Sequence, residues 1–247
     1  MTLRAGNRVT ASASVEAVAC AGVTRLPVLA SQPPLVLRRT PSAVYVVGGA
    51  AGPIGGDELS LRISVAEGAF LRVRTAAASI ALPGPDGVES VLNVSIDVGA
   101  GGRLEYLPEP VVVSAGARHA TVITVTLAEG ASLLLRDEVL LGRHGEDGGA
   151  ARSVLRADYA GRPLLRQALE VSGADDASLG PAVLAAHRAV GNLLQVDPAT
   201  DPDLRPLRVP VARASPQVAV MPLAGPGILV TALANDAVTL RRRLDQP

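Results

Sequence analysis

The sequence predicts an all-β fold: a β-helix-like stack of roughly 14–17 strands, with two α-helices in the C-terminal third. Short runs of alternating apolar and polar residues recur along the 247-residue chain, as in residues 91–98. A strand–turn–strand unit occurs three times, and its turn glycines Gly68, Gly101 and Gly130 lie 33 and 29 positions apart. Such repeats indicate stacked β layers that cover each other's apolar faces. The strands follow one another without helical crossovers, which excludes a βαβ architecture.

The expected strands are bounded by glycine, proline or other turn residues. In chain order they comprise residues 14–21, 23–29, 35–38, 44–47, 59–65, 71–75, 91–98, 104–107, 111–113, 121–127, 133–141, 153–159, 163–171 and 227–233. Residues 133–141 are the most continuously apolar of these, which predicts a strand covered on both faces. Pro108 and Pro110 predict an exposed kink or a sheet edge, because proline cannot donate to a central ladder.

Two helices are expected after the β stack. Residues 181–195 place apolar side chains at helical spacing behind Pro181, which suits a first helical turn. Residues 237–244 form the second, with Asp236 as a capping residue and arginines near the C-terminal end. We therefore expect one domain over residues 1–247, with the β stack in residues 13–172. In residues 173–247 a helix, a proline-rich surface connection, a strand and the last helix pack on the stack.

The composition excludes several classes of function. The formal net charge is zero, which argues against nucleic acid or an anionic membrane as the main partner. All 23 basic residues are arginine, so Schiff-base and Walker-type lysine chemistry is excluded. A single cysteine, Cys20, allows no internal disulfide, and we expect it to be a buried structural thiol. No convincing signal peptide and no run of 18 apolar residues is present, so we expect a cytoplasmic protein that does not span a membrane.

Motifs for catalysis are missing as well. The three histidines lack the spacing of a zinc site, and no GxSxG nucleophile elbow occurs. The glycine-rich loop of residues 48–56 suggests a phosphate cradle at first sight, but a strand follows it and lysine is absent. This loop is therefore expected to be a structural turn that leads into the next strand.

Acidic residues in unusual settings are the remaining candidates for chemistry. Asp57 closes the glycine-rich loop, Asp137 and Glu138 interrupt an apolar run, and Glu170 lies between two apolar residues. Taken singly, each is expected to be solvated or paired, since an isolated buried charge is costly. Taken together, they could line a hydrated path for a divalent cation, because such ions take oxygen ligands when thiols and imidazoles are scarce.

A series of short motifs resembles the UreD (UreH) family of urease accessory proteins. They run in family order over about residues 15–245. They are Thr24-Arg25-Leu26, Gln32-Pro33-Pro34-Leu35, Gly48-Gly49 through Gly55-Gly56-Asp57, Leu104-Glu105-Tyr106-Leu107-Pro108-Glu109-Pro110, Ala115-Gly116-Ala117-Arg118, Leu141-Gly142-Arg143 with Gly145-Glu146, Gly161-Arg162-Pro163-Leu164 and Gly227-Ile228-Leu229-Val230. The glycine–glycine–aspartate loop, the LExLPEP stretch and the LGR–GE pair are fairly specific in combination.

The resemblance implies a urease maturation factor without catalytic activity and with one UreD-like domain. Proteins of this family join UreF-type and UreG-type partners on the urease apoenzyme and help deliver nickel, while the UreG-type partner hydrolyses GTP. No tightly bound cofactor is implied; nickel is in transit, through an internal channel. By position, the resemblance assigns Asp57, Asp137, Glu146 and Glu170 to the transient nickel path. Among the departures from the family pattern, an arginine common in the last strand is Thr231 here.

Two other readings remain open at the level of sequence. One is a β-helical carbohydrate-active enzyme with paired carboxylates as general acid and base. The scarcity of aromatic residues, 2% of the chain, disfavours it, because sugar-binding clefts use aromatic stacking. The other is a structural β scaffold without a metal role.

Overall fold

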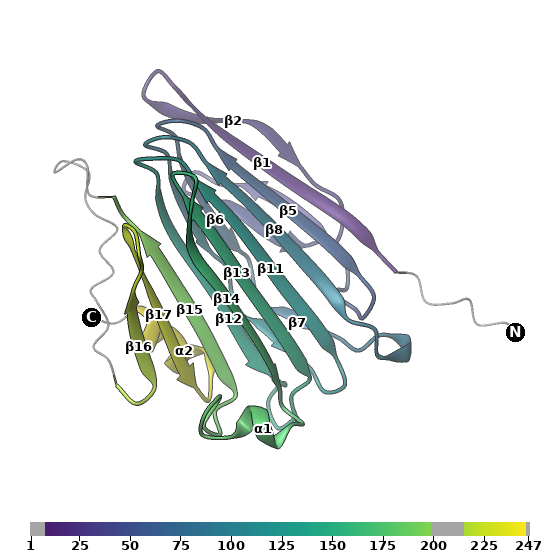
Figure 1. The fold of residues 1–247 in the computed structure, drawn as a ribbon. Coiled ribbons are helices and arrows are strands. Elements are labelled where there is room, and N and C mark those ends of the chain that lie inside the picture. The colour runs from purple at the N-terminus through teal and green to yellow at the C-terminus, as the bar shows by residue number, and fades with distance from the viewer. Residues whose placement is uncertain (1–7, 199–214, 246–247) are drawn as a thin grey trace, which may run out of the picture.

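The computed structural model describes residues 8–198 and 215–245 and consists mainly of two β-sheets (Figure 1). Sheet A has the strand order β14-β13-β11-β8-β5-β1-β2, and the main path of sheet B has the order β16-β17-β15-β12-β9-β6-β4-β3. The strands of sheet A are β1 (Thr10–Cys20), β2 (Val23–Ala30), β5 (Glu58–Val65), β8 (Ser90–Val98), β11 (Arg118–Leu127), β13 (Ala150–Tyr159) and β14 (Arg162–Ser172). Those of sheet B are β3 (Leu35–Arg39), β4 (Val44–Gly48), β6 (Phe70–Thr75), β7 (Ser79–Ala81), β9 (Arg103–Leu107), β10 (Val111–Val113), β12 (Ser132–Leu141), β15 (Ala189–Val196), β16 (Val218–Pro222) and β17 (Gly227–Ala234). The predicted all-β stack is confirmed.

The repeated unit of the sequence is a single step of this stack. Strands β5, β8 and β11 of sheet A each lead through a tight turn into β6, β9 and β12 of sheet B, and neighbours within each set are parallel. The turns contain Gly68, Gly101 and Gly130 at φ values of 63°, 61° and 77°. Glycine suits these positions because side chains with a Cβ are strained in the left-handed region. Antiparallel strands close both ends, as in the predicted hairpin of β13 and β14.

The largest apolar core lies between the two sheets. Alternating positions supply it, such as Leu61 and Ile63 of β5 and Leu133 and Leu135 of β12, all almost fully buried. Because successive side chains of a strand point to opposite faces, one apolar half of each alternating run faces inward. The aliphatic core expected from the composition is confirmed.

The helix predicted for residues 181–195 is wrong, although two helices are present. These are α1 (Asp176–Leu179) and α2 (Ala237–Asp245), and the second agrees with the prediction. Residues 189–196 form strand β15, paired antiparallel with β12 and β17. All eight residues of β15 are buried, because the core covers one face and α2 packs on the other. A strand buried on both faces lacks alternation, and its apolar residues also match a helical period.

Several smaller predictions differ from the structure. The short strands β7 and β16 were not expected, and Cys20 is exposed at the end of β1 rather than buried. Pro108 and Pro110 separate β9 from β10, but both strands pair with β12, so the kink lies inside sheet B and not at the predicted exposed edge. Most of the proline-rich connection lies outside the described residues. None of the described helices has the length and apolar character that crossing a bilayer requires.

Candidate metal path

A row of polar side chains interrupts the aliphatic space between the two sheets. Asp137 of β12 alternates with the core residues Leu135 and Val139 and is 6% exposed. From the opposite sheet, the Ser153 hydroxyl on β13 donates a hydrogen bond of 2.5 Å to Oδ2 of Asp137. This bond crosses the molecule's interior from sheet A to sheet B. We call the whole set the interior polar row; its members are Ser90, His119, Thr121, Ser153, Asp137, Asn192, Gln167 and Thr231.

Burial dominates the electrostatics of the acid at the middle of the row. Loss of hydration raises the pKa of Asp137, and the hydrogen bond from Ser153 opposes part of that rise. Tyr106 of β9 is fully buried nearby; burial and the charge of Asp137 both raise the pKa of its hydroxyl. A carboxylate in this setting gains much from a cation, because its own charge is poorly hydrated.

His119 on β11 supplies an imidazole to the same row. Its Nδ1 lies 2.9 Å from the Ser90 hydroxyl oxygen, and its Nε2 lies 3.3 Å from that of Thr121. Burial lowers the pKa of His119 to about 4, against a smaller raising effect of Glu89. The ring is therefore neutral near pH 7, with one ring nitrogen able to act as an acceptor or as a metal ligand. His119 also lines a cavity of about 320 Å³ beside Gly48 and Gly52 of the glycine-rich loop.

The far part of the row is made of neutral groups. Asn192 of β15 is 3% exposed and lies directly opposite Asp137 in the β12–β15 ladder. Its Oδ1 accepts hydrogen bonds from the Thr231 hydroxyl at 2.7 Å and from Nε2 of Gln167 at 3.2 Å. Gln167 and Thr231 line a second cavity of about 270 Å³ between β14 and β16.

Strand register joins these pieces into one row. Thr121 pairs with Ser153 between β11 and β13, and Asn192 pairs with Thr231 between β15 and β17. Side chains opposite each other on neighbouring strands lie close enough to interact. The interior polar row therefore begins at the cavity beside His119 and ends at the cavity beside Gln167 and Thr231.

Asp57, the acid predicted at the glycine-rich loop, lies apart from this row. It is 2% exposed at the start of β5, and its two oxygens accept the backbone N–H groups of Val9 and Ile54 at 3.0 and 2.9 Å. The loop is packed tightly, since a Cβ on Gly55 would lie 2.6 Å from the backbone nitrogen of Gly84. Asp57 thus ties the loop to the first strand, as expected of a structural turn.

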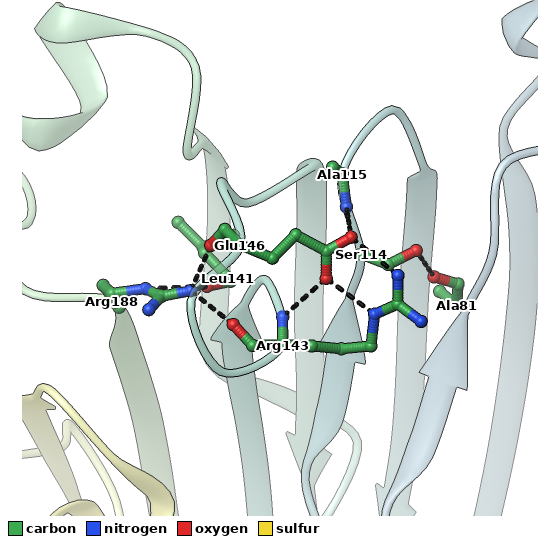
Figure 2. A network of polar contacts seen from close by, with 7 residues as sticks. All are labelled: Ala81, Ser114, Ala115, Leu141, Arg143, Glu146 and Arg188. Carbon is green, nitrogen blue, oxygen red and sulfur yellow. Dashed lines mark hydrogen bonds and ion pairs between the residues drawn. The ribbon is translucent and has the colours of Figure 1, made fainter.

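Glu146 lies in the loop between β12 and β13 and holds this loop together through hydrogen bonds (Figure 2). Its carboxylate accepts the backbone N–H groups of Ala115 and Arg143 and a bidentate pair from the Arg143 guanidinium. These bonds, with the Arg143 side chain contributing most, lower the pKa of Glu146 to about 2. Arg188 donates to the carbonyl oxygens of Leu141, Arg143 and Glu146 from the other side of the loop.

The four predicted acids therefore occupy four separate places. Glu170 is exposed on β14, where it pairs in register with Arg152. Only Asp137 belongs to the interior polar row. Within residues 8–198 and 215–245, no three His, Cys, Asp or Glu side chains gather as a metal site. The roles of all four acids in metal transfer stay predictions.

Comparison with known proteins identifies the family to which this chain is related. The family model described as UreD urease accessory protein matches residues 9–246. A Streptomyces griseus protein named urease accessory protein UreD 3 is 47% identical over 232 residues, which cover 90% of this chain and 89% of the relative. The chain belongs to the UreD urease accessory protein family. A Parafrankia relative is 43% identical, covering 91% of this chain and 82% of its own, and a Streptomyces coelicolor relative is 47% identical, covering 91% and 89%.

In this UreD-family chain, the row contains atom types that can ligate a divalent transition metal ion. Oxygen atoms of Asp137, Gln167 and Thr231 and a ring nitrogen of His119 are ligand types that nickel accepts. The donors are spread along the row rather than gathered in one cage, and Asp137, whose pKa burial raises, is the only acid among them. Such an arrangement favours weak binding at several points over storage at one.

Sequence reasoning identified one member of the row and missed the others. The spacing of the histidines does not single out His119, and the apolar periodicity predicts a helix at Asn192, where strand β15 forms instead. The signal that could have found them is the repeat itself. Aligning the three turn glycines places successive strands side by side, which shows which polar residues occupy inward positions.

Proposed function

We propose that this chain is a urease maturation factor: a non-catalytic, cytoplasmic scaffold and metallochaperone that helps deliver nickel. It joins UreF-type and UreG-type partners on the urease apoenzyme, and nickel is its cargo rather than a resident cofactor. Family membership over nearly the whole chain supports the urease role. The observation that carries the nickel role is the interior polar row, which joins two cavities through an otherwise aliphatic core.

The proposed mechanism is passage between weak, successive sites. A cation leaving water loses hydration, and Asp137 offsets that loss because its own charge is poorly hydrated in the core. His119 offers a neutral ring nitrogen at one end, and the amide and hydroxyl oxygens offer neutral ligands at the other. The aliphatic walls keep bulk water away from the ion. The chain contributes position and exclusion rather than bond making.

The carbohydrate-enzyme reading has no support in the geometry. A glycosidase needs two carboxyl groups facing one cleft, about 5–10 Å apart. Asp137 faces the hydroxyl of Ser153, and the carboxylates that do gather, Glu109 and Glu138, are both engaged by the guanidinium of Arg241.

The decisive test replaces the charge in the middle of the row. We expect Asp137→Asn, which keeps the shape and the Ser153 contact, to lower the nickel content of urease at least about tenfold. The measurement is nickel per urease active site, after co-expression with the urease subunits and the other accessory proteins at limiting nickel. Asp97→Asn, an exposed acid on the outer face of sheet A, is the matched control and should leave the nickel content unchanged.

Assembly is measured in the same samples. Asp137→Asn should still co-purify with the UreF-type partner and with urease. Normal nickel content of urease with this variant would contradict the proposed nickel path. Loss of co-purification with the partners would assign Asp137 a folding role instead.

A further inference from the structure

Helix α2 covers only one part of the outer face of sheet B. It packs on β15 and β17 (Figure 1), where its Leu240 and Leu244 belong to a buried cluster that also includes Leu107 of β9. Strands β6, β4 and β3 follow β9 towards the opposite end of the sheet. The outward side chains of these three strands are all at least partly exposed. This part of the face is therefore open to a partner.

The open part of the face is strongly basic. Strands β3, β4, β6 and β9 together contain five arginines and one acidic residue. Because they alternate with core residues, the outward charged side chains are those of Arg38, Arg72, Arg74, Arg103 and Glu105. Glu105 is 7% exposed and lies 2.5 Å from the guanidinium of Arg72 and 3.5 Å from that of Arg74. One carboxylate among four guanidiniums leaves an excess of positive charge.

The outer face of sheet A has a different pattern of charge. There, arginines have acidic partners of their own, as Arg62 has Asp97 and Arg166 has Asp158. Such pairs cancel their charges locally. The formal net charge of the chain is zero, so the basic excess is a property of one face rather than of the whole protein.

The only phenylalanine of the chain lies on the same basic face. Phe70 is 40% exposed, although the core of the protein is built from apolar side chains. The guanidinium carbons of Arg72 and Arg103 lie over its ring, 5.5 and 5.6 Å from the centroid. These cation–π contacts hold the arginines around the ring. Phenylalanine and arginine are both enriched in protein interfaces, which makes this group a candidate contact point.

Strand register places a second group beside the first. Tyr45 of β4 lies opposite Arg38 of β3 on one side and Arg74 of β6 on the other. Neighbouring strands are about 4.8 Å apart, so the two arginines flank the tyrosine on adjacent strands. Guanidinium groups bind carboxylates through two parallel hydrogen bonds, and a tyrosine hydroxyl can donate another. The row is therefore suited to carboxylates.

We propose that the outer face of β3, β4, β6 and β9 docks an acidic, extended segment of a partner protein. Carboxylates of the segment bind Arg38 and Arg74 on either side of Tyr45, and one of its apolar side chains packs against Phe70. The four strands span roughly 14 Å, which fits a single segment rather than a whole protein face. The surface lies outside the interior polar row, so the inference goes beyond the proposed nickel delivery and does not depend on it.

The composition of the face favours carboxylates of a protein over other anions. A phosphodiester backbone that crossed the face would pass Glu105, whose charge repels phosphate, whereas separate carboxylates can avoid it. Insertion into a membrane needs several exposed apolar side chains, and Phe70 is the only large one on these four strands. A formal net charge of zero also gives no long-range attraction to nucleic acid or to an anionic membrane.

The test measures binding of a fluorescein-labelled peptide to the full-length chain by fluorescence anisotropy. In this peptide glutamate alternates with serine around one central leucine. We expect the double variant Arg38→Gln/Arg74→Gln to raise the Kd of the peptide at least about tenfold, because two guanidiniums are lost. Replacing the glutamates of the peptide by glutamine should have the same effect. Arg62→Gln, on the outer face of sheet A, is the matched control and should leave the Kd unchanged.

Phe70→Ser tests the apolar contact separately. It should raise the Kd of the leucine-containing peptide several-fold and have less effect on a peptide with serine in place of the leucine. Because Phe70 is exposed, this variant also serves as the test if the double variant does not fold.

Four results would overturn the docking surface. The first is equal binding of the glutamate and glutamine peptides, and the second is an unchanged Kd in a folded double variant. The third is an equal loss of binding in Arg62→Gln, which would indicate non-specific attraction of charges. The fourth is tighter binding of phosphatidylserine vesicles or of single-stranded oligothymidylate, abolished in the double variant. The titrations contain no nickel, so failure of the proposed nickel path would not change them.

Discussion

At the scale of single residues, the environment of His119 lowers its affinity for a proton. The ring is buried between sheets A and B, and its two nitrogens face the hydroxyls of Ser90 and Thr121 rather than a carboxylate. A protonated ring would be poorly hydrated there, which is why burial lowers the pKa to about 4. The fold thus controls the protonation of a residue that the sequence pattern does not single out.

This environment makes the stability of the protein depend on pH. The pKa of His119 is about 4 in the folded chain and about 6.5 when unfolded, so the unfolded state binds the proton more tightly. The contribution of neutral His119 is complete above about pH 6.5 and is lost as the pH falls towards 4. We expect the free energy of unfolding to fall by up to about 1.4 kcal/mol per pH unit in this window from this residue.

Urea denaturation at several pH values between 4 and 7 measures the effect. His119→Gln keeps a polar side chain and should flatten the slope, so the difference between variant and parent isolates this residue. The pKa values of Asp137 and Glu138 are raised by burial and act in the opposite direction in both proteins. Parallel curves for the two proteins would contradict the prediction.

At the scale of elements, the contact of α2 with β15 depends on a glycine. A Cβ on Gly191 would lie 2.9 Å from Cδ1 of Leu244, 3.2 Å from Cδ2 of Leu240 and 3.3 Å from the backbone oxygen of Asp137. The helix packs closely on the strand here because this position has no side chain. The same contact keeps the far face of β15 dry, below the interior polar row.

Gly191→Ala should therefore destabilise the chain by about 1–3 kcal/mol, because the added methyl group overpacks the interface with α2. Leu244→Ala alone should also destabilise it, by leaving a cavity. In the double variant the new methyl group occupies part of that cavity, so the total loss should be smaller than the sum of the two. Urea unfolding of all four proteins gives the coupling, and strict additivity would show that the two side chains do not meet.

The element level is also where the sequence was hardest to interpret. Strands with one face exposed, such as β5 and β8, were predicted almost to the residue, because alternation reports a single buried face. Strand β15 was predicted to be a helix because burial on both faces removes alternation. The interior polar row could not be predicted from the sequence for a related reason. Its hydrogen bonds join the two sheets, and a local sequence pattern carries no information about partners in the other sheet.

At the scale of the whole molecule, the parallel centre of the stack predicts slow folding. Neighbouring strands of each sheet are separated in sequence by a full turn of the stack, as Leu61 and Val94 are. Such distant pairs must meet before their contacts stabilise the chain, and folds of this kind refold in milliseconds to seconds. Stopped-flow refolding from urea, followed by far-ultraviolet circular dichroism, should show this range, and complete refolding within microseconds would contradict it.

The repeated turn also gives the molecule a unit of length. Each strand–turn–strand unit adds one strand to both sheets and so extends the stack by about 4.8 Å. The interior polar row moves between neighbouring strands in both sheets, from Thr121 to Ser153 in sheet A and from Asp137 through Asn192 to Thr231 in sheet B. The length of the stack is therefore set by the number of strands in each sheet. The distance between the two cavities depends on the number of strands between them. Insertion or loss of one unit would therefore change this distance by about 4.8 Å.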